Sequence, residues 1–149
     1  MADELDLTTK EIPDAIDGAA LRGRQIAIAH IDGQGDPIVS FRGSTYVYGP
    51  AQLALWSRKA DSGLASAIAG SPRVHVIYYG GVDGPGPRFL SFKGSARVDP
   101  SANDAVYDAM IEGERNADPE RKGVAVIVDV ESVEGFAADG PFRMERSAG

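Results

Sequence analysis

The fold is decided by residues 53–79, which read LALWSRKADSGLASAIAGSPRVHVIYY. Leu53 to Trp56 supply the bulk that favours a strand, and a polar, basic corner follows them. From Leu64 onward, apolar residues recur at helical spacing. Gly70 and Pro72 predict the end of that helix, because Gly accepts a left-handed cap and Pro cannot continue the hydrogen-bond ladder. Alternating apolar residues after Pro72 predict a second strand.

The corner between the first strand and the helix has the groups that bind a phosphate. Ser57, Arg58 and Lys59 end the strand, and Asp61 or Ser62 is placed to cap the helix. The helix amides and the positive end of the helix dipole favour an anion there, and Arg offers a planar fork for its oxygens. Two solvated charges at the end of a strand are the alternative interpretation of Arg58 and Lys59.

Composition indicates one soluble domain over residues 1–149, with residues 1–9 and 147–149 loosely held. The chain has no cysteine, so we expect no disulfide and no metal site built on thiolates. Its net charge of −7 argues against nucleic acid or an anionic membrane as a partner. No apolar run approaches the ~20 residues of a membrane span, and the start lacks a signal peptide. We therefore expect a cytoplasmic protein with a small-molecule substrate.

The rest of the chain alternates strands with turns. We expect a helix over residues 9–17, a second after Ser101, and strands over 24–31, 37–41, 45–48, 88–98 and 123–136. Residues 80–87 should form a loop, 112–122 a charged surface connection and 140–149 a polar tail, and Gly94 should mark a bulge or close approach. Hairpin connections dominate, which predicts a mainly β, antiparallel domain shaped as a small closed or split barrel.

Short motifs recur in one order along the chain. They are SFRGS at 40–44, FKGSARV at 92–98, GVAVIVDVESVEG at 123–135, and between them Trp56, Arg58, Gly63-Leu64, Ala67-Ile68, Pro72, Val74, Val76 and Tyr78. Together they resemble the pyridoxamine 5′-phosphate oxidase-like family, the flavin-binding split β-barrels. The resemblance implies an antiparallel split barrel and a homodimer. It also implies flavin mononucleotide (FMN), or in relatives a deazaflavin (F420) or haem, bound in grooves between subunits.

The resemblance also implies a set of site residues. The strand end and helix start around Arg58 would meet the cofactor phosphate, and the strand that carries Ser40 and Arg42 would meet the pyrimidine edge of a flavin. A polar outer face of a half-exposed hairpin is the alternative for that strand. The expected cofactor-binding residues are Ser40, Arg42, Ser44, Trp56, Ser57, Arg58, Lys59 and Ser62.

Aromatic side chains allow two interpretations. Trp56, Tyr78 and Tyr79 could stack on an isoalloxazine ring, or they could belong to the core or to a dimer interface. For the interface, the expected apolar surface is formed by Tyr46, Tyr48, Tyr78 and Tyr79.

Other titratable residues carry no motif of a metal site or a nucleophile. His30 and His75 lie on separate apolar strands, so we interpret both as packed, hydrogen-bonded side chains. The acidic residues around Asp118 lack the spacing of a calcium loop and are interpreted as solvated surface.

The function expected from these observations is an FMN-dependent oxidoreductase with no named catalytic residue. The chain has no GxSxG, Walker, HExxH or GxGxxG motif, which leaves hydrolase, nucleotidase and Rossmann dehydrogenase functions without support. The alternatives are a deazaflavin-dependent reductase, or a non-catalytic protein that stores or senses flavin or haem. We expect no pyridoxamine phosphate oxidase activity, because the basic C-terminal segment of those enzymes has no counterpart here.

Overall fold

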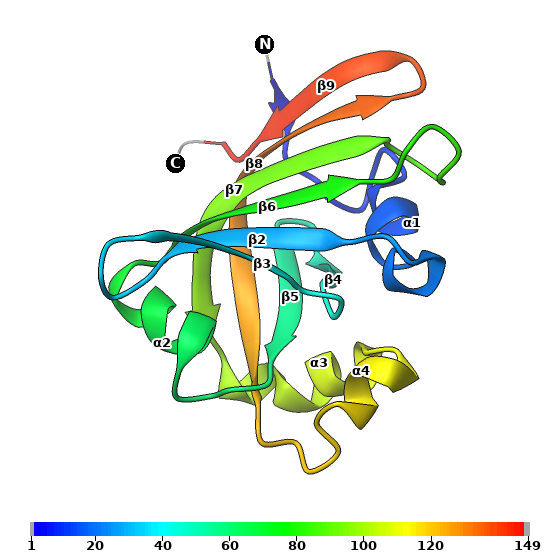
Figure 1. Cartoon of the computed structure of the whole chain (residues 1–149). Helices are drawn as coiled ribbons and strands as arrows, with labels where there is room; N and C mark the ends of the chain where they lie inside the picture. The colour runs from blue at the N-terminus through cyan, green and yellow to red at the C-terminus, as the bar shows by residue number, and fades with distance from the viewer. Residues whose placement is uncertain (1, 148–149) are drawn as a thin grey trace.

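The computed structural model describes residues 2–147 and consists mainly of β-strands (Figure 1). The strands are β1 (Asp3–Glu4), β2 (Ile26–Ile31), β3 (Pro37–Phe41), β4 (Tyr46–Gly49), β5 (Gln52–Ser57), β6 (Arg73–Tyr79), β7 (Phe89–Val98), β8 (Val124–Ala137) and β9 (Gly140–Glu145). The helices are α1 (Ile12–Ile16), α2 (Gly63–Gly70), α3 (Asn103–Ala109) and α4 (Glu112–Asn116), and single 3₁₀ turns lie at Ala20–Arg22 and Pro100–Ala102.

The strands form one open, nine-stranded mixed sheet. Its main path runs β1-β9-β8-β7-β6-β2-β3, while β5 pairs with β8 and β4 pairs with β5. Only the β1–β9 ladder is parallel among the ladders of residues 2–147. The expectation of a mainly β, largely antiparallel domain is confirmed. Closure into a barrel is not observed, because no ladder within the described chain joins β3 to β4.

The turn between β3 and β4 explains why the sheet stays open. The Thr45 amide and hydroxyl both donate to the Arg42 carbonyl, at 3.2 and 2.8 Å, and close a tight turn directly after β3. This turn carries the chain from the β3 edge to β4, which pairs with β5 instead.

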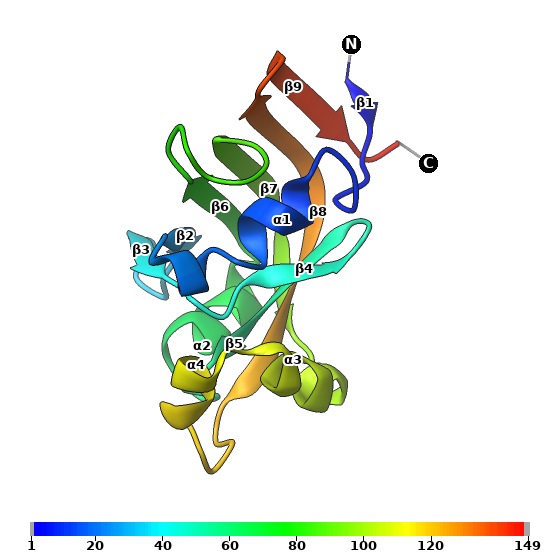
Figure 2. The ribbon, with the colours of Figure 1, turned by 90° about the vertical axis from the view of Figure 1, so that its right-hand side faces the viewer.

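Two cores meet on β5 and on the first part of β8, Val124 to Val128, where both faces are buried. Leu53 and Leu55 lie in the main core, whereas Ala54 and Trp56 lie in a second core against α3. Burial of both faces explains why these segments are continuously apolar, since a strand with one solvent-exposed face would alternate apolar and polar residues. The second core and α4 lie at the end of the molecule away from the chain termini (Figure 2). The predicted bulge in β7 is confirmed at Lys93/Gly94.

Both ends of the chain differ from the expectation of loose or polar segments. Leu5 and Leu7 are buried in the main core, and β1 pairs with β9 beside it. Met144 is buried in the same core, and Phe142 packs against it. The two strands therefore lie side by side, as Figure 1 shows. The apolar residues of each segment alternate with period two, which was the signal for a strand. Residues 148–149 lie outside the described residues.

α2 covers one end of the sheet. Leu64, Ala65 and Ile68 are buried where the helix packs against β2 and β7. The helix ends at Gly70 as predicted, but the glycine with left-handed φ is Gly63 at its start, at φ 60°. No helix of the described residues is both long and apolar enough for a transmembrane span.

One face of β2, β3 and β6, which we call the outer face, is uncovered. Val39 and Phe41 are each 68% exposed, Tyr79 is 61% exposed and Ile77 is 44% exposed. Tyr78 lies on the opposite face, fully buried, and its hydroxyl accepts a hydrogen bond of 2.9 Å from Arg22. Of the interpretations of Tyr78, a place in the core is therefore confirmed, whereas stacking on a flavin and a place in an interface are not, because the strand turns the side chain inward.

Candidate functional site

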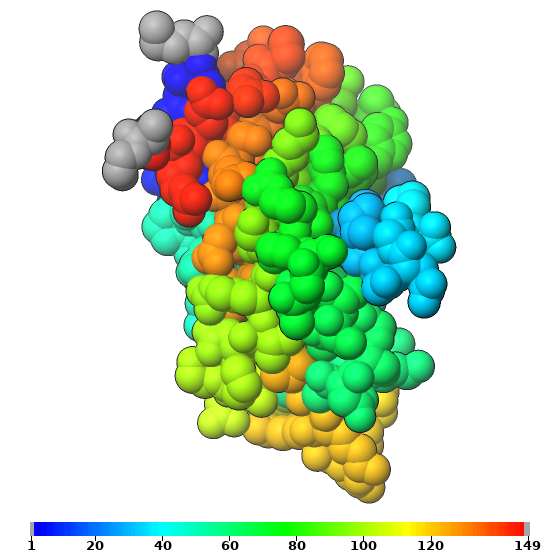
Figure 3. Space-filling model, turned by 90° about the vertical axis from the view of Figure 1, so that its left-hand side faces the viewer, coloured from blue at the N-terminus to red at the C-terminus, as the bar shows by residue number. Residues whose placement is uncertain are grey.

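A groove of about 900 Å³ runs between α2 and the β2–β3 hairpin. We call it the α2 groove. In Figure 3 the cyan hairpin projects from the body beside the green α2. The wall formed by α2 carries small side chains and Leu64, and the wall formed by the hairpin combines polar and charged side chains with Ile31 and Ile38. The main lining residues are His30, Asp32, Ile38, Ser40, Arg42, Asp61, Ser62, Gly63, Ser66, Ala67, Gly70 and Ser71.

Arg42 is a half-buried cation in this groove. Its Nε donates to Ser40 Oγ at 3.1 Å, which holds the guanidinium over β3. No carboxylate in residues 2–147 pairs with it, whereas Arg73, Arg97 and Arg143 all have carboxylate partners.

The charge of Arg42 is uncompensated. Burial of the guanidinium lowers its pKa from the ordinary value, and the positive charge of Arg58 lowers it further. Arg58, in the corner predicted from the sequence, therefore lies close enough to Arg42 for the two charges to interact. A half-buried cation that has no carboxylate partner and stands near a second cation favours a bound anion.

The corner that carries Arg58 and Lys59 is fixed by a hydrogen bond from Ser57 and by close packing against Gly123. The Ser57 hydroxyl donates to the Lys59 carbonyl at 3.1 Å and closes the bend. A Cβ on Gly123 would lie 2.3 Å from the Ser57 carbonyl oxygen and 2.9 Å from the Arg58 Cα, so only glycine permits this approach. Arg58 and Lys59 are exposed, and neither is among the residues that line the groove.

Ser62 occupies the N-cap position of α2. Its backbone is extended, with φ −150°, but its side chain makes no capping hydrogen bond. The hydroxyl therefore stays available at the mouth of the groove, beside the first amides of the helix. Asp61 also lines this end and is the one carboxylate there.

Trp56 and Ser44, two of the predicted site residues, are buried and do not line the α2 groove. The Trp56 side chain is 4% exposed, packs edge-on against Tyr107 at 5.3 Å between ring centroids, and donates from Nε1 to Asp118 at 2.9 Å. Ser44 Oγ accepts from the Trp56 amide at 2.9 Å and joins the start of β4 to β5. Neither side chain is free to contact a ligand. The Ser57 hydroxyl likewise donates to the Lys59 carbonyl, within the protein.

Asp118 is a structural residue that sequence reasoning placed on the surface. It is 7% exposed, and besides the Trp56 indole it accepts from the Lys122 and Gly123 amides, at 2.9 and 2.8 Å. Burial raises the pKa of its carboxyl, but these hydrogen bonds together outweigh burial and lower it. The sequence signal was its place between two apolar segments, ahead of Gly123.

The two histidines have different surroundings. His75 is hydrogen-bonded to Ser91 on the outer face, as a packed histidine should be. His30 is 5% exposed and lines the α2 groove, but its Nδ1 is buried without a hydrogen-bond partner in residues 2–147. Burial lowers the pKa of His30, as does Arg42, while Asp32 raises it. The prediction of a packed side chain is correct, but the predicted hydrogen bond is missing.

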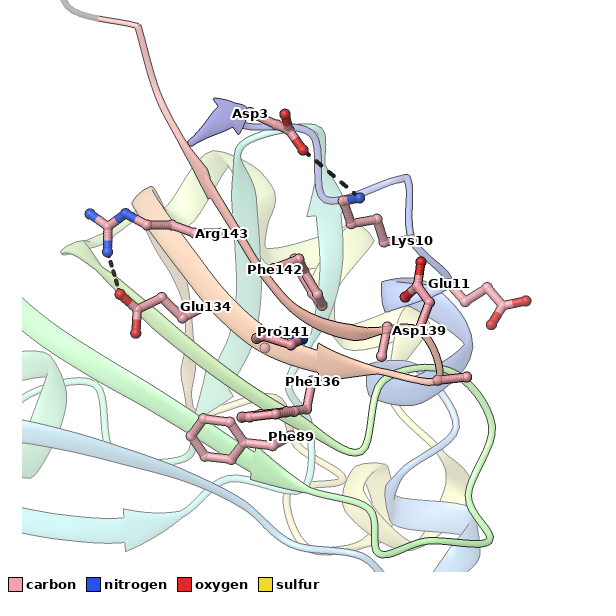
Figure 4. A pocket seen from close by; sticks show the side chains of 13 residues that line it. Asp3, Lys10, Glu11, Phe89, Glu134, Phe136, Asp139, Pro141, Phe142 and Arg143 are labelled. Carbon is pink, nitrogen blue, oxygen red and sulfur yellow. Dashed lines mark hydrogen bonds and ion pairs between the residues drawn. The ribbon is translucent and has the colours of Figure 1, made fainter. Parts of the chain in front are cut away.

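A second pocket, of about 840 Å³, lies at the other end of the sheet between the β8–β9 hairpin and the start of α1 (Figure 4). Its Lys10 pairs with Asp3 at 4.0 Å, and its Arg143 pairs with Glu134. Because these cations are already neutralised, this pocket lacks the unpaired charge found in the α2 groove.

No family model and no curated protein matches the sequence, but solved structures of similar fold do match the chain. General Stress Protein 26 from Bacillus anthracis is 14% identical and superposes with a TM-score of 0.67 over 93% of this chain and 98% of its own. A pyridoxamine 5′-phosphate oxidase-related, FMN-binding protein from Nostoc punctiforme is 14% identical, with a TM-score of 0.60 over 86% of this chain and 82% of its own. The chain has the pyridoxamine 5′-phosphate oxidase-like fold. An F420 reductase shares this fold at 18% identity and a TM-score of 0.59, over 89% of this chain and 98% of its own. The resemblance read from the sequence motifs is confirmed at this level.

Proposed function

We propose that the chain is an FMN-binding oxidoreductase that acts on a small molecule, with the cofactor phosphate at the positive end of the α2 groove. The observation that carries the proposal is the half-buried guanidinium of Arg42, which has no carboxylate partner in residues 2–147 and lies near a second unpaired cation, Arg58. Neighbours of this fold whose names include FMN or F420 support a cofactor of the flavin class.

The residues present fit a phosphate monoester. Its charge of about −1.5 to −2 at neutral pH matches two guanidinium groups. Arg42 and Arg58 would supply charge-assisted hydrogen bonds, and the amides of α2 and the Ser62 hydroxyl would complete the cradle. The Ser40 hydroxyl, which orients Arg42 at 3.1 Å, would fix the direction of the guanidinium. Lys59 would contribute attraction at longer range.

The division of labour between cofactor and protein explains the lack of an acid, base or nucleophile in the groove. A bound flavin supplies the exchange of a hydride with the substrate. The chain binds, orients and shields it, and the small side chains of α2, Ser66, Ala67 and Gly70, leave room for a ligand along the helix.

We further propose that two copies associate through the outer face, which completes the split-barrel arrangement and places each groove at a subunit boundary. The open sheet edges at β3 and β4 and the exposed apolar side chains of the outer face support this arrangement.

The test is titration of FMN into the apo protein, followed by flavin fluorescence at fixed salt. Arg42→Ala and Arg58→Ala should each weaken binding about tenfold to 150-fold, the effect of losing one charge-assisted hydrogen bond. Lys59→Ala should weaken binding less, and Arg97→Ala should not weaken it, because Arg97 pairs with Asp129 and Asp99 away from the groove.

The absorption spectrum of the purified protein distinguishes the alternatives. Oxidised flavin bands support the proposal, whereas deazaflavin bands or a haem Soret band would replace FMN with that cofactor. Equal FMN affinity of wild type and Arg42→Ala would place the phosphate outside the α2 groove.

A further inference from the structure

His30 is a polar side chain in the α2 groove whose hydrogen-bonding capacity the protein does not use. Its side chain is 5% exposed, it lines the groove, and its Nδ1 has neither solvent contact nor a partner in residues 2–147. Since Nδ1 is the buried atom of a residue that lines the groove, the opposite edge of the imidazole, with Nε2, faces the groove.

One form of the ring can donate to a ligand in the groove. Arg42 stands nearby on the hairpin wall and Asp32 lies in the turn beyond β2. The α2 helix, which packs against β2 and forms the other wall of the groove, contains no charged residue. A neutral imidazole carries a single proton. Nδ1 has no partner in either tautomer, as a donor if it carries the proton and as an acceptor if it does not. With the proton on Nε2, the N–H donor is placed where a ligand in the groove can accept from it.

Strand register fixes where that donor lies relative to the positive end. In the β2–β3 ladder Ile28 pairs with Ser40, and His30 pairs with Ile38. The Arg42 guanidinium is held over Ser40, so His30 stands two residues, roughly 7 Å, further along the groove toward the hairpin turn. A phosphate held by Arg42 and Arg58 alone would not fill this position.

We propose that His30 is a binding residue that donates from Nε2 to an oxygen on the chain of a phosphorylated ligand, beyond the phosphate. The proposal rests on the placement of the phosphate given above. It assigns the ligand class: a phosphate monoester with an oxygen-bearing chain, such as a polyol phosphate, extended along α2 rather than a bare anion.

The experiment compares two probes, FMN and inorganic phosphate, on four proteins: wild type, His30→Leu, His30→Gln and Arg42→Ala. His30→Leu should weaken FMN about tenfold and leave the phosphate affinity unchanged. His30→Gln should keep most of the FMN affinity, because its amide supplies a donor at a similar reach. Arg42→Ala should weaken both probes. Melting temperatures identify any variant that fails to fold. If His30→Leu does not fold, His30→Gln is compared instead with His30→Asn, whose shorter amide does not reach the ligand.

Nitrogen NMR of the ring gives an independent reading, because the chain has two histidines and the second, His75, serves as the reference. His30 should be an Nε2–H tautomer whose shift moves with FMN and not with phosphate, while His75 should not move. Equal FMN affinity of wild type and His30→Leu overturns the inference and leaves the phosphate site intact. An equal loss of both probes in His30→Leu overturns it as well. Binding that survives Arg42→Ala overturns the proposed phosphate site instead, and absence of FMN binding by wild type overturns both.

Discussion

At the scale of single residues, the candidate site depends on which polar groups the fold leaves unsatisfied. Ser44, Ser57 and Trp56 have polar atoms, but each is used to hold β5 and its corner in place. His30 is as buried as these residues and Arg42 is half-buried, yet both retain unused donors or acceptors. Residue type alone does not separate these two classes, because the same serine or tryptophan can bind a ligand or brace a strand. Only the hydrogen-bond partners distinguish them.

Asp118 carries a prediction for stability at acid pH. Hydrogen bonds lower its folded pKa below the ordinary value near 3.9, so its contribution is fully present above that pH and is lost as the pH falls through the folded pKa. Asp118→Asn turns an N–H toward a donor and should cost about 1–3 kcal/mol at pH 7. Urea unfolding at several pH values measures both effects. The difference in free energy of unfolding between wild type and variant should be constant from pH 7 to about 5 and should decrease below about 4. A difference that increases on acidification would contradict this role.

At the scale of elements, sequence periodicity predicted strands where one signal was clear. Residues 24–31 were predicted to form a strand, and Ile26, Ile28 and His30 are all buried on one face of β2. β9 was missed because Gly, Pro and charged residues surround its two apolar positions, which gives the segment a low strand propensity. The strand forms because it pairs with β1 and β8 on its two sides. The open sheet was missed for a similar reason. The pairing of β4 is a long-range property, set by a turn after Arg42 that composition does not reveal.

Gly123 tests how the corner is supported. A Cβ there would meet the Ser57 carbonyl oxygen at 2.3 Å and the Trp56 Nε1 at 2.6 Å, so Gly123→Ala must displace β5 from β8. We expect a loss of about 1–3 kcal/mol in the free energy of unfolding, together with weaker FMN binding, because Arg58 moves with the strand. Gly113→Ala is the matched control, since a Cβ at that site in α4 meets nothing within 4 Å. The control should match wild type or be more stable by up to about 1 kcal/mol. Unchanged stability of Gly123→Ala in a denaturant titration would show that the corner tolerates the shift.

At the scale of the whole molecule, the outer face predicts the oligomeric state. Val39 and Phe41 on β3 and Tyr79 on β6, the two strands that flank β2, are each more than 60% exposed. Side chains of this kind are enriched where a second subunit packs. Sedimentation at micromolar concentration should give twice the chain mass of 15.7 kDa. Phe41→Glu should shift the protein to a monomer, because it would bury a charge between two copies of the same face. Leu21→Glu, at a residue that is 75% exposed away from the sheet, should leave the dimer unchanged. Phe41 and Arg42 are neighbours on opposite faces of the hairpin, so the monomer should also bind FMN more weakly if a partner closes the groove. A wild-type monomer that binds FMN tightly would show that one chain forms the complete site.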